Sequence, residues 1–537
     1  MLDRCGTANE WWRGAVIYQI YPRSFADSNG DGVGDLPGVT AHLDHVARLG
    51  VDAIWLCPVF TSPQRDFGYD VADHTAIDPI FGTMDDFDAM IARAHALGLR
   101  VLIDQVWSHT SDKHSWFTQS RVSRTNPAAD WYVWADASAD GTPPNNWLSV
   151  FGGAAWTWEP RRRQYYLHHF LSHQPQLNLH NAEVQDALLE TGRFWLDRGV
   201  DGFRLDAIDF FTHDPALRSN PAVPPGRPAP AKLFGQQVHL HDMMQPQTHG
   251  FLARIRELTD AYPGAVALGE VSSQDGAFDR CRGYSSGTDK LHMAYSLRAT
   301  RQDFTWAGMR GLVEEAAGQG GWLCWSLSNH DVERAISRWN PQPDDAPDPC
   351  FAQLLMALQL SIRGSVVVYQ GEELGLTEVQ LTADQLRDPF GIAYWPEFRG
   401  RDGSRTPMPW AQSADGGGFT TGTPWLPLPH AHLRLAVDAQ ERDPGAMLHA
   451  WRRVLAYRRA HPALVTGGLR LLDLAEPLLG FVREDEEEQV VCLFNLSADV
   501  MAVPQALGVG PHVLGPYGTS FTAMPVGHVM AREFASA

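Results

Sequence analysis

The sequence is poor in several features that define large protein classes. It contains no run of about 18 apolar residues, so we expect no transmembrane helix. The N-terminal residues lack a basic start followed by an uninterrupted apolar stretch, so we expect no signal peptide and a cytoplasmic protein. The six cysteines are widely spaced and form no C-x-x-C motif, which indicates reduced thiols rather than a disulfide framework or a zinc site.

Positive charge is also scarce. The 43 Lys and Arg residues are outnumbered by 63 Asp and Glu residues, which gives a net charge of −20 at pH 7. Phosphate backbones and anionic membranes attract basic surfaces, so this balance argues against nucleic acids and membranes as partners. The hydrophobic content of 44% is that of a globular protein.

Short β-branched or apolar runs recur along the chain, and each is followed by a helical pattern. Strands that alternate with helices predict parallel pairing with crossover helices, and eight such units predict an α/β fold, the closed (β/α)₈ TIM barrel. The eight runs are residues 14–25, 51–60, 100–109, 199–209, 265–271, 290–297, 322–331 and 365–373.

Two interruptions and a change of pattern divide the chain. We expect the barrel to comprise residues 1–106 and 176–465, separated by a loop-rich inserted subdomain at residues 107–175 that is rich in Trp, Pro and Asn. A lid-like loop at residues 210–248 contains a proline-rich stretch and follows the fourth strand. Short strands from about residue 468 predict an antiparallel β domain at residues 466–537.

Polar residues gather where the predicted strands end. In a TIM barrel the carboxyl ends of the strands meet at one face and supply the active site, so these side chains are expected to converge. A single strand-end Asp can instead cap the next helix, but that reading does not account for acids at the ends of several strands. The residues are Asp104, His109, Arg204, Asp206, Glu270, Asn329, His330 and Asp331.

Arg204 and Asp206 lie two apart on one strand, so their side chains point to the same side. The arginine would favour the ionised form of Asp206, whereas burial beside other carboxylates would raise the pKa of Glu270. An ionised carboxylate and a protonated one, about 5–5.5 Å apart, are what a retaining glycosidase needs. No cofactor is required for this chemistry.

Six stretches together resemble glycoside hydrolase family 13, the α-amylase family, in its α-glucosidase and oligo-1,6-glucosidase branch. They are "DQVWSH", "QPQLNLH", "GFRLDAID", "ALGEV", "LSNHD" and "YQGEELGL", in that order along most of the chain. The resemblance implies Asp206 as the nucleophile, Glu270 as the general acid and base, and Asp331 as the stabiliser of the transition state.

The same resemblance implies a subsite for the glucose that is cleaved. His109, Arg204 and His330 would line it, Tyr69 would stack on the sugar, and Asp66 would bind its hydroxyl groups. Arg401 would contact the same sugar and, with Asp66, close the pocket so that only a chain end fits. Ala207, which follows the nucleophile, implies a preference for α-1,4 bonds, since α-1,6-specific relatives tend to carry valine there.

"DSNGDGVGD" at residues 27–35 places oxygen donors at alternating positions, as the start of a calcium-binding EF-hand loop does. Hard oxygen ligands suit Ca²⁺ or Mg²⁺, although Gly38 stands where a complete EF-hand loop carries Glu. With support from the resemblance, we expect a structural cation far from the chemistry; the alternative is a polar turn. The candidate ligands are Asp27, Asn29, Asp31, the Val33 carbonyl and Asp35.

The sequence therefore predicts a retaining α-glucosidase that acts on small oligosaccharides or α-glucosides, with transglucosylation available to the same intermediate. A trehalose synthase or sucrose isomerase type of transferase, or an oligo-1,6-glucosidase, would share all three acids. A non-catalytic relative, such as an amino-acid-transporter heavy chain, is disfavoured because those proteins carry a membrane span and usually lose catalytic acids.

Overall fold

The computed structural model describes residues 10–224, 232–273, 275–342, 347–508 and 510–526. Its centre is a parallel sheet with the strand order β11-β10-β9-β5-β2-β1-β13-β12. A parallel bridge between Ala294 and Leu323 joins the two outermost strands and closes the sheet, which confirms the predicted (β/α)₈ barrel. The strands are β1 (Val16–Ile20), β2 (Ala53–Leu56), β5 (Arg100–Gln105), β9 (Gly202–Leu205), β10 (Val266–Val271), β11 (Met293–Ser296), β12 (Cys324–Ser326) and β13 (Ser365–Tyr369).

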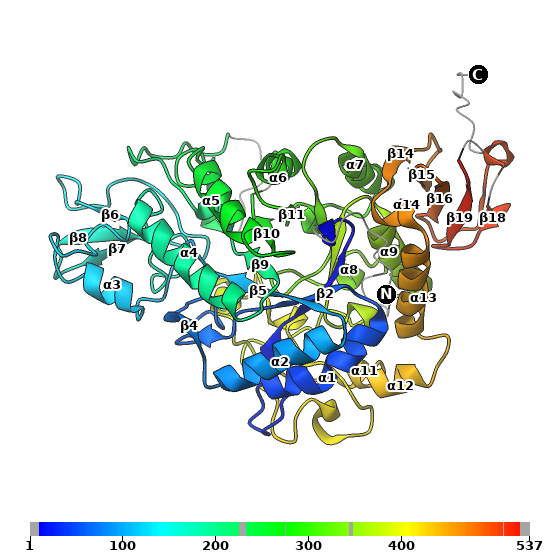
Figure 1. The fold of residues 1–537 in the computed structure, drawn as a ribbon, viewed down its shortest axis with the longest axis horizontal. Coiled ribbons are helices and arrows are strands. Elements are labelled where there is room, and N and C mark those ends of the chain that lie inside the picture. Colours follow the sequence, from blue (N-terminus) through cyan, green and yellow to red (C-terminus); the bar gives the residue numbers. More distant parts are fainter. Residues whose placement is uncertain (1–9, 225–231, 274, 343–346, 509, 527–537) are drawn as a thin grey trace.

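Helices surround this barrel and alternate with its strands along the chain (Figure 1). The principal ones are α1 (Leu36–Leu49), α2 (Met84–Ala96), α4 (Ala182–Asp197), α5 (Thr248–Asp260), α6 (Ala277–Ser285), α7 (Trp306–Ala317), α9 (Pro349–Ser361) and α13 (Met447–Ala460). Shorter helices are α8 (Ala335–Arg338), α10 (Pro389–Tyr394), α11 (His430–Leu433), α12 (Val437–Glu441) and α14 (Pro462–Val465).

Local sequence signals explain where the first helices begin and end. Asp35 caps α1 by accepting a hydrogen bond from the Gly38 amide, and Gly50 ends the helix in the left-handed region. Thr83 and Asp86 form a reciprocal capping box at the start of α2. These caps satisfy amides that have no partner inside the helix.

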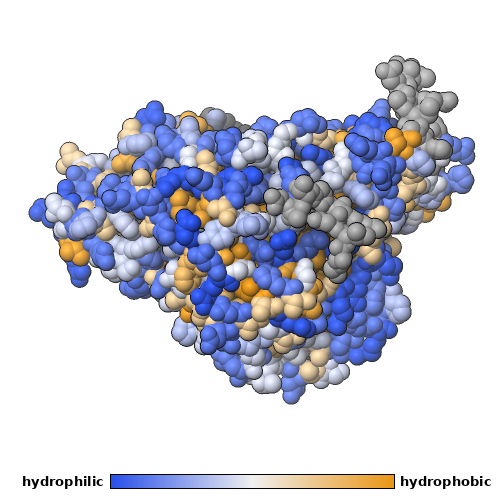
Figure 2. Space-filling model, viewed as in Figure 1, coloured by the Kyte–Doolittle hydropathy of each residue, from blue (hydrophilic) through white to orange (hydrophobic). Residues whose placement is uncertain are grey.

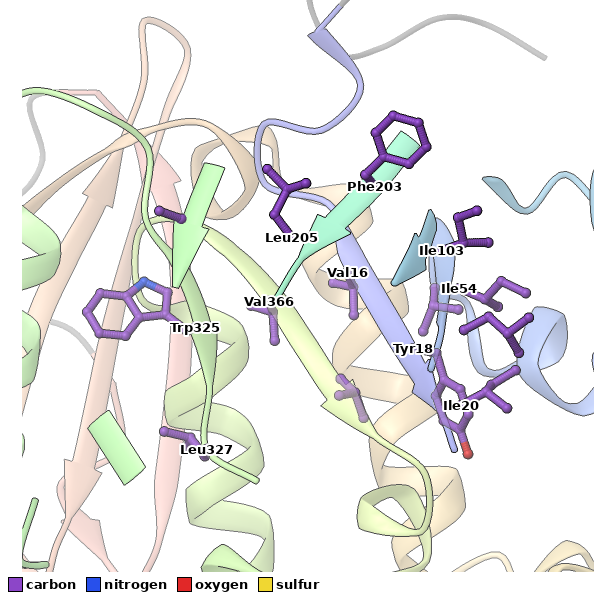
Figure 3. Packing of buried hydrophobic residues seen from close by; sticks show 14 of the residues in the cluster. Val16, Tyr18, Ile20, Ile54, Ile103, Phe203, Leu205, Trp325, Leu327 and Val366 are labelled. Carbon is purple, nitrogen blue, oxygen red and sulfur yellow. The ribbon is translucent and has the colours of Figure 1, made fainter. Parts of the chain in front are cut away.

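The barrel strands are buried along nearly their whole length because both of their faces are covered. Phe203 and Leu205 of β9 belong to the large apolar cluster that also includes residues of the surrounding helices. Figure 3 shows Val16, Tyr18 and Ile20 of β1 in the same cluster. Since successive side chains on a strand point to opposite faces, Arg204 faces the interior of the barrel.

Smaller sheets lie outside the barrel. The sheet between β5 and α4 and the sheet in the C-terminal part of the chain lie at opposite ends of the molecule in Figure 1. Between β5 and α4, a three-stranded antiparallel sheet follows the short helix α3 (Ser115–Ser120); between β2 and α2, β3 (Phe60–Thr61) pairs with β4 (Asp73–Ile77). The strands of the three-stranded sheet are β6 (Trp134–Ala135), β7 (Trp156–Glu159) and β8 (Gln164–Leu167).

The C-terminal part of the chain is an antiparallel sheet of order β14-β15-β16-β19, with a second pair, β17-β18. This is the type of structure that the sequence predicted there. Its strands are β14 (Gly468–Leu471), β15 (Leu478–Glu484), β16 (Glu488–Asn495), β17 (Met501–Ala502), β18 (Val513–Leu514) and β19 (Thr519–Pro525).

Hydrophilic residues predominate on the face of the molecule shown in Figure 2. Among the described residues, no helix has the length and apolar character needed to cross a membrane. The five cysteines of the described ranges are free thiols, and Cys5 lies outside those ranges. The lid-like loop is described at residues 210–224 and 232–248, so part of its proline-rich stretch also lies outside the description.

Candidate active site

One buried arginine contacts three carboxylates at the mouth of the barrel. Arg204 Nη1 donates to Asp206 Oδ1 at 2.7 Å and to Asp104 Oδ1 at 2.8 Å. Its Nη2 lies 2.6 Å from Glu270 Oε2, and Tyr295 OH accepts hydrogen bonds from Nε and Nη2. The expectation that Arg204 accompanies Asp206 was therefore too narrow, because the same guanidinium also binds Asp104 and Glu270.

The backbone after the nucleophile candidate turns sharply. Ala207 adopts a left-handed conformation with φ 44° and ψ 49°, which costs a non-glycine residue about 1–2 kcal/mol. The turn directs the Ala207 amide to Glu270 Oε2, at 3.1 Å. The hydrogen bond that this turn allows thus joins the segment after Asp206 to Glu270 on β10.

Burial raises the pKa values of Asp206 and Glu270 into the neutral range. It raises the pKa of Asp206 to about 7, against the opposing effect of Arg204 and with a further increase from Asp104 and Asp331. It also raises the pKa of Glu270 to about 7, and Arg204 opposes this shift while Asp206 and Asp331 add to it. The two groups share one guanidinium, so they titrate as a coupled pair, and one proton between them is favoured near neutral pH.

Asp331 is held in the opposite state. It follows β12, and its Oδ1 accepts hydrogen bonds from Arg401 Nη1 at 3.2 Å and Arg405 Nη2 at 2.8 Å. Burial opposes ionisation, but His330, Arg401 and Arg405 hold the pKa of Asp331 well below its usual range. This carboxylate therefore stays negative across the working pH range of the pair Asp206 and Glu270.

Histidine and tyrosine rings form part of the same buried wall. The Tyr69 ring stacks on His330 with the planes 7° apart, and its hydroxyl donates to Asp104 Oδ2 at 3.0 Å. His109 Nε2 lies 3.1 Å from the Tyr69 carbonyl oxygen. Burial lowers the pKa of His109 and of His330 to about 3, so both rings are neutral hydrogen-bonding groups at pH 7.

A second cluster of ion pairs lies beside Asp331. Arg401 Nη2 donates to Asp66 Oδ1 and to Asp388 Oδ1, each at 2.7 Å. The other oxygen of Asp66 accepts a hydrogen bond from Gln174. Asp66 therefore bridges the segment after β3 and the segment around Arg401, which are far apart in the sequence.

All nine predicted substrate and catalytic residues thus belong to one contact network. Four further members of this network were not predicted as site residues: Gln174, Tyr295, Asp388 and Arg405. Asp104 was expected among the converging strand-end residues but was given no role. Asp104 and Tyr295 lie on barrel strands and point towards Arg204, so their positions on these strands predict that they reach the site. Asp388 and Arg405 lie in irregular segments after β13, where no periodicity places a side chain.

The predicted cation loop is a separate feature. Asp27 accepts hydrogen bonds from the amides of Asn29, Gly30 and Gly32. Both oxygens of Asp35 are used, one to cap α1 and the other to bind Ser28. The described residues contain no group of three or more His, Cys, Asp or Glu side chains that could hold a metal ion, so the cation stays a prediction based on oxygen donor type.

Comparison with known proteins agrees with this geometry. Residues 19–467 match the family model described as the alpha-amylase catalytic domain. The chain belongs to the alpha-amylase family. This confirms the resemblance seen in the sequence, and with it a glycoside hydrolase rather than a non-catalytic relative.

Relatives within the alpha-amylase family cover almost the whole chain. A "probable alpha-glucosidase" of Rhizobium meliloti is 54% identical over 91% of this chain and 90% of the relative. An oligo-1,6-glucosidase of Heyndrickxia coagulans is 35% identical over 96% of this chain and 98% of the relative. The crystal structure of the α-glucosyl transfer enzyme XgtA has a TM-score of 0.91 and 51% identity, covering 96% of this chain and 99% of that chain.

Proposed function

We propose that the protein is a retaining α-glucosidase that releases terminal glucose from small α-glucosides. The observation that carries the proposal is the pair of carboxylates, Asp206 and Glu270, on the two terminal nitrogens of one guanidinium. This shared partner supports the short separation typical of a nucleophile with an acid/base rather than the wider gap of inverting enzymes. The α-glucosidase and α-glucosyl transfer relatives agree with it.

In the first step, Glu270 donates its proton to the glycosidic oxygen while the Asp206 carboxylate attacks the anomeric carbon. The C–O bond to the leaving group breaks and a β-glucosyl ester forms on Asp206. Ester formation removes the negative charge of Asp206, so the pKa of Glu270 falls and its carboxylate can act as a base. It then takes a proton from water or from a sugar hydroxyl, which attacks the ester and regenerates the α configuration.

Asp331, Arg401 and Asp66 act on the glucose ring rather than on proton transfer. A carboxylate kept ionised by Arg401 and Arg405 stabilises the positive charge that develops on the oxocarbenium-like glucose ring. The ion pair between Asp66 and Arg401 closes the pocket behind that ring. A closed end admits the terminal glucose and excludes the interior of a polymer.

The linkage preference is a finer proposal. Ala207 leaves more room beside the nucleophile than the valine expected in α-1,6-specific enzymes, which supports cleavage of α-1,4 bonds. The oligo-1,6-glucosidase relative keeps α-1,6 cleavage as the second candidate. A transferase of the trehalose synthase or sucrose isomerase type is the third, because it would use the same acids.

One experiment separates these candidates. The purified protein is incubated separately with maltose, isomaltose and sucrose, and the products are identified by NMR as they form. We expect glucose from maltose, with isomaltose cleaved more slowly, and α-glucose as the first sugar released from nitrophenyl α-glucoside, which yields a single glucose per turnover. A rearranged disaccharide as the main product would assign the protein to the transferases, and β-glucose as the first sugar from nitrophenyl α-glucoside would overturn the retaining mechanism.

We further propose that the loop at residues 27–35 binds a structural divalent cation, with the side chains of Asp27, Asn29, Asp31 and Asp35 and the Val33 carbonyl as its ligands. The support is the set of hard oxygen donors in one short loop. Calorimetric titration of chelator-treated protein with Ca²⁺ tests this proposal. Asp31→Ala removes a predicted ligand, so binding lost in that variant is the expected result.

We also propose a cytoplasmic location, which the free thiols of the described cysteines support.

A further inference from the structure

A row of aromatic rings with two cations packed against them leads away from the active site. The Arg401 guanidinium lies 5.3 Å from the centre of the Phe151 ring, and Phe151 packs on Phe390 at 4.6 Å. On the next step of the row, Lys232 Nζ lies 4.1 Å from the Phe390 ring centre and 3.5 Å from that of Phe398. We call these five residues the mouth stack.

The mouth stack joins three parts of the chain that are distant in sequence. Phe151 belongs to the insertion after β5, Phe390 belongs to α10, and Lys232 belongs to the lid-like loop after β9. Asp388, the N-cap of α10, is the residue that also binds Arg401. A displacement of α10 would therefore be felt both by the lid-like loop and by the closed end of the glucose pocket.

The ammonium group of Lys232 is in an unusual environment. Within the described ranges it has no carboxylate within ion-pair distance, whereas Lys113 on the insertion pairs with Asp112 and is well exposed. Aromatic faces attract a cation electrostatically and partly replace the water that burial removes. Burial lowers the pKa of Lys232 to about 8, Arg301 and Arg401 lower it further, and Asp388 opposes them.

Just beyond Lys232, the lid-like loop forms a wall beside the nucleophile. Phe234 lies 6.3 Å from Phe210, which is four residues after Asp206. Phe234 and Met243 pack in one apolar cluster with Ala207. These contacts place an apolar wall of the lid-like loop beside the residue that follows Asp206.

The loop has a second attachment that does not depend on Lys232. Asn146 of the insertion accepts a hydrogen bond from the Asn220 amide at 2.8 Å and donates one to the Asn220 carbonyl at 2.8 Å. Gln237 donates to the Asn146 carbonyl at 2.7 Å. A change at Lys232 should therefore loosen one edge of the loop without detaching it.

We propose that Lys232 is a positioning residue that holds the lid-like loop against α10 and so shapes the subsite for the leaving or accepting sugar. The inference rests on the proposed glucosidase function. By microscopic reversibility, the reducing glucose of maltose and an accepting glucose occupy the same subsite. A loosened wall weakens the binding of both, and it affects a small planar leaving group or water much less.

The test compares Lys232→Met, which removes the charge, with Lys232→Arg, which keeps a cation that can stack on the rings. Lys113→Met is the matched control on the insertion. For each protein we measure kcat/KM on maltose and on nitrophenyl α-glucoside, and the ratio of transfer to hydrolysis with added glucose. In Lys232→Met we expect the maltose value and the transfer ratio to fall about fivefold, the size of one partly desolvated cation–π contact, with the nitrophenyl value within twofold of wild type.

Lys232→Arg should recover at least half of the loss, and Lys113→Met should match wild type. In wild type the maltose preference should decline above about pH 8 as Lys232 loses its proton, whereas the arginine variant should not decline there. Equal losses on both substrates, or a Lys232→Arg variant as impaired as Lys232→Met, would overturn the proposal. A wild-type protein that cleaves neither substrate would instead refute the glucosidase function itself.

Discussion

Replacing Arg204 by Met tests the idea that one guanidinium sets the ionisation of the catalytic pair. Arg204 contacts Asp206 and Glu270 at 2.7 and 2.6 Å, and all three side chains are buried. A charge pair at close range contributes about 4 kcal/mol at an effective dielectric constant near 20. That energy corresponds to about three pKa units for a carboxylate that loses the partner.

The pKa of Asp206, already about 7, would therefore rise to about 10 in Arg204→Met. An acid with a raised pKa is protonated at pH 7, so the ionised nucleophile would fall from about half of the molecules to about one in a thousand. We expect kcat/KM for nitrophenyl α-glucoside at pH 7 to fall by a factor of about 10² to 10³. The acidic limb of the pH profile should move up by at least two pH units.

The assay is the pH dependence of kcat/KM between pH 5 and 10, with circular dichroism to show that the variant is folded. Tyr295→Phe is the control, because it removes the hydroxyl that accepts two Arg204 hydrogen bonds but leaves the cation in place. We expect its acidic limb to move by less than one unit. A folded Arg204→Met variant with an acidic limb still near pH 7 would show that Arg204 does not set the ionisation of Asp206.

Three other predictions concern two residues of the site, Asp388 and Ala207, and one acid outside it, Glu378, which accepts a hydrogen bond from the Arg334 amide. Asp388 accepts hydrogen bonds from Arg401 through both carboxylate oxygens, and Asp388→Asn weakens them. We expect KM for maltose to rise about tenfold while kcat changes less. Steady-state kinetics measure both constants, and an unchanged KM would contradict this prediction. Ala207→Val puts a β-branched residue into a left-handed conformation, so the Tm should drop by a few degrees. The valine also narrows the space beside Asp206, so the ratio of maltose to isomaltose activity should fall. A higher ratio would contradict the proposal that Ala207 favours α-1,4 bonds. Burial raises the pKa of Glu378 to about 8, above its unfolded value, so its contribution to stability is complete below about pH 4 and is lost as the pH rises towards 8. The Tm of Glu378→Gln should therefore fall less than the Tm of wild type between pH 5 and 8. Plots of Tm against pH that run parallel for the two proteins would contradict the raised pKa of Glu378.

The parts of the fold that periodicity and strand position encode were the ones the sequence could predict. The eight apolar runs became barrel strands because each is buried on both faces, and Arg204, Asp206 and Glu270 followed from their places at strand ends. Asp388, Arg405 and Lys232 could not be placed in this way, because they lie in irregular segments whose paths depend on tertiary contacts. Their roles depend on partners such as Asp331 and Phe390 that are far away in the chain.

The sharing of Arg204 was also hidden in the sequence. The two-residue spacing of Arg204 and Asp206 shows that they face the same side of a strand, but it contains no information about Asp104 or Glu270 on neighbouring strands. Only the register of β5, β9 and β10 brings those acids to the same guanidinium. The ionisation of the site is therefore a property of the closed barrel and not of one motif.

In the proposed mechanism, Asp206 attacks the sugar and carries it as a covalent ester. A fluorinated glucosyl fluoride forms the glucosyl-enzyme faster than water cleaves it, so incubation with this reagent followed by peptide mass spectrometry identifies the residue that carries the sugar. We expect one fluoroglucosyl group on the peptide that contains Asp206 and none in Asp206→Asn. Label on a different residue, or turnover by Asp206→Asn at the wild-type rate, would contradict it.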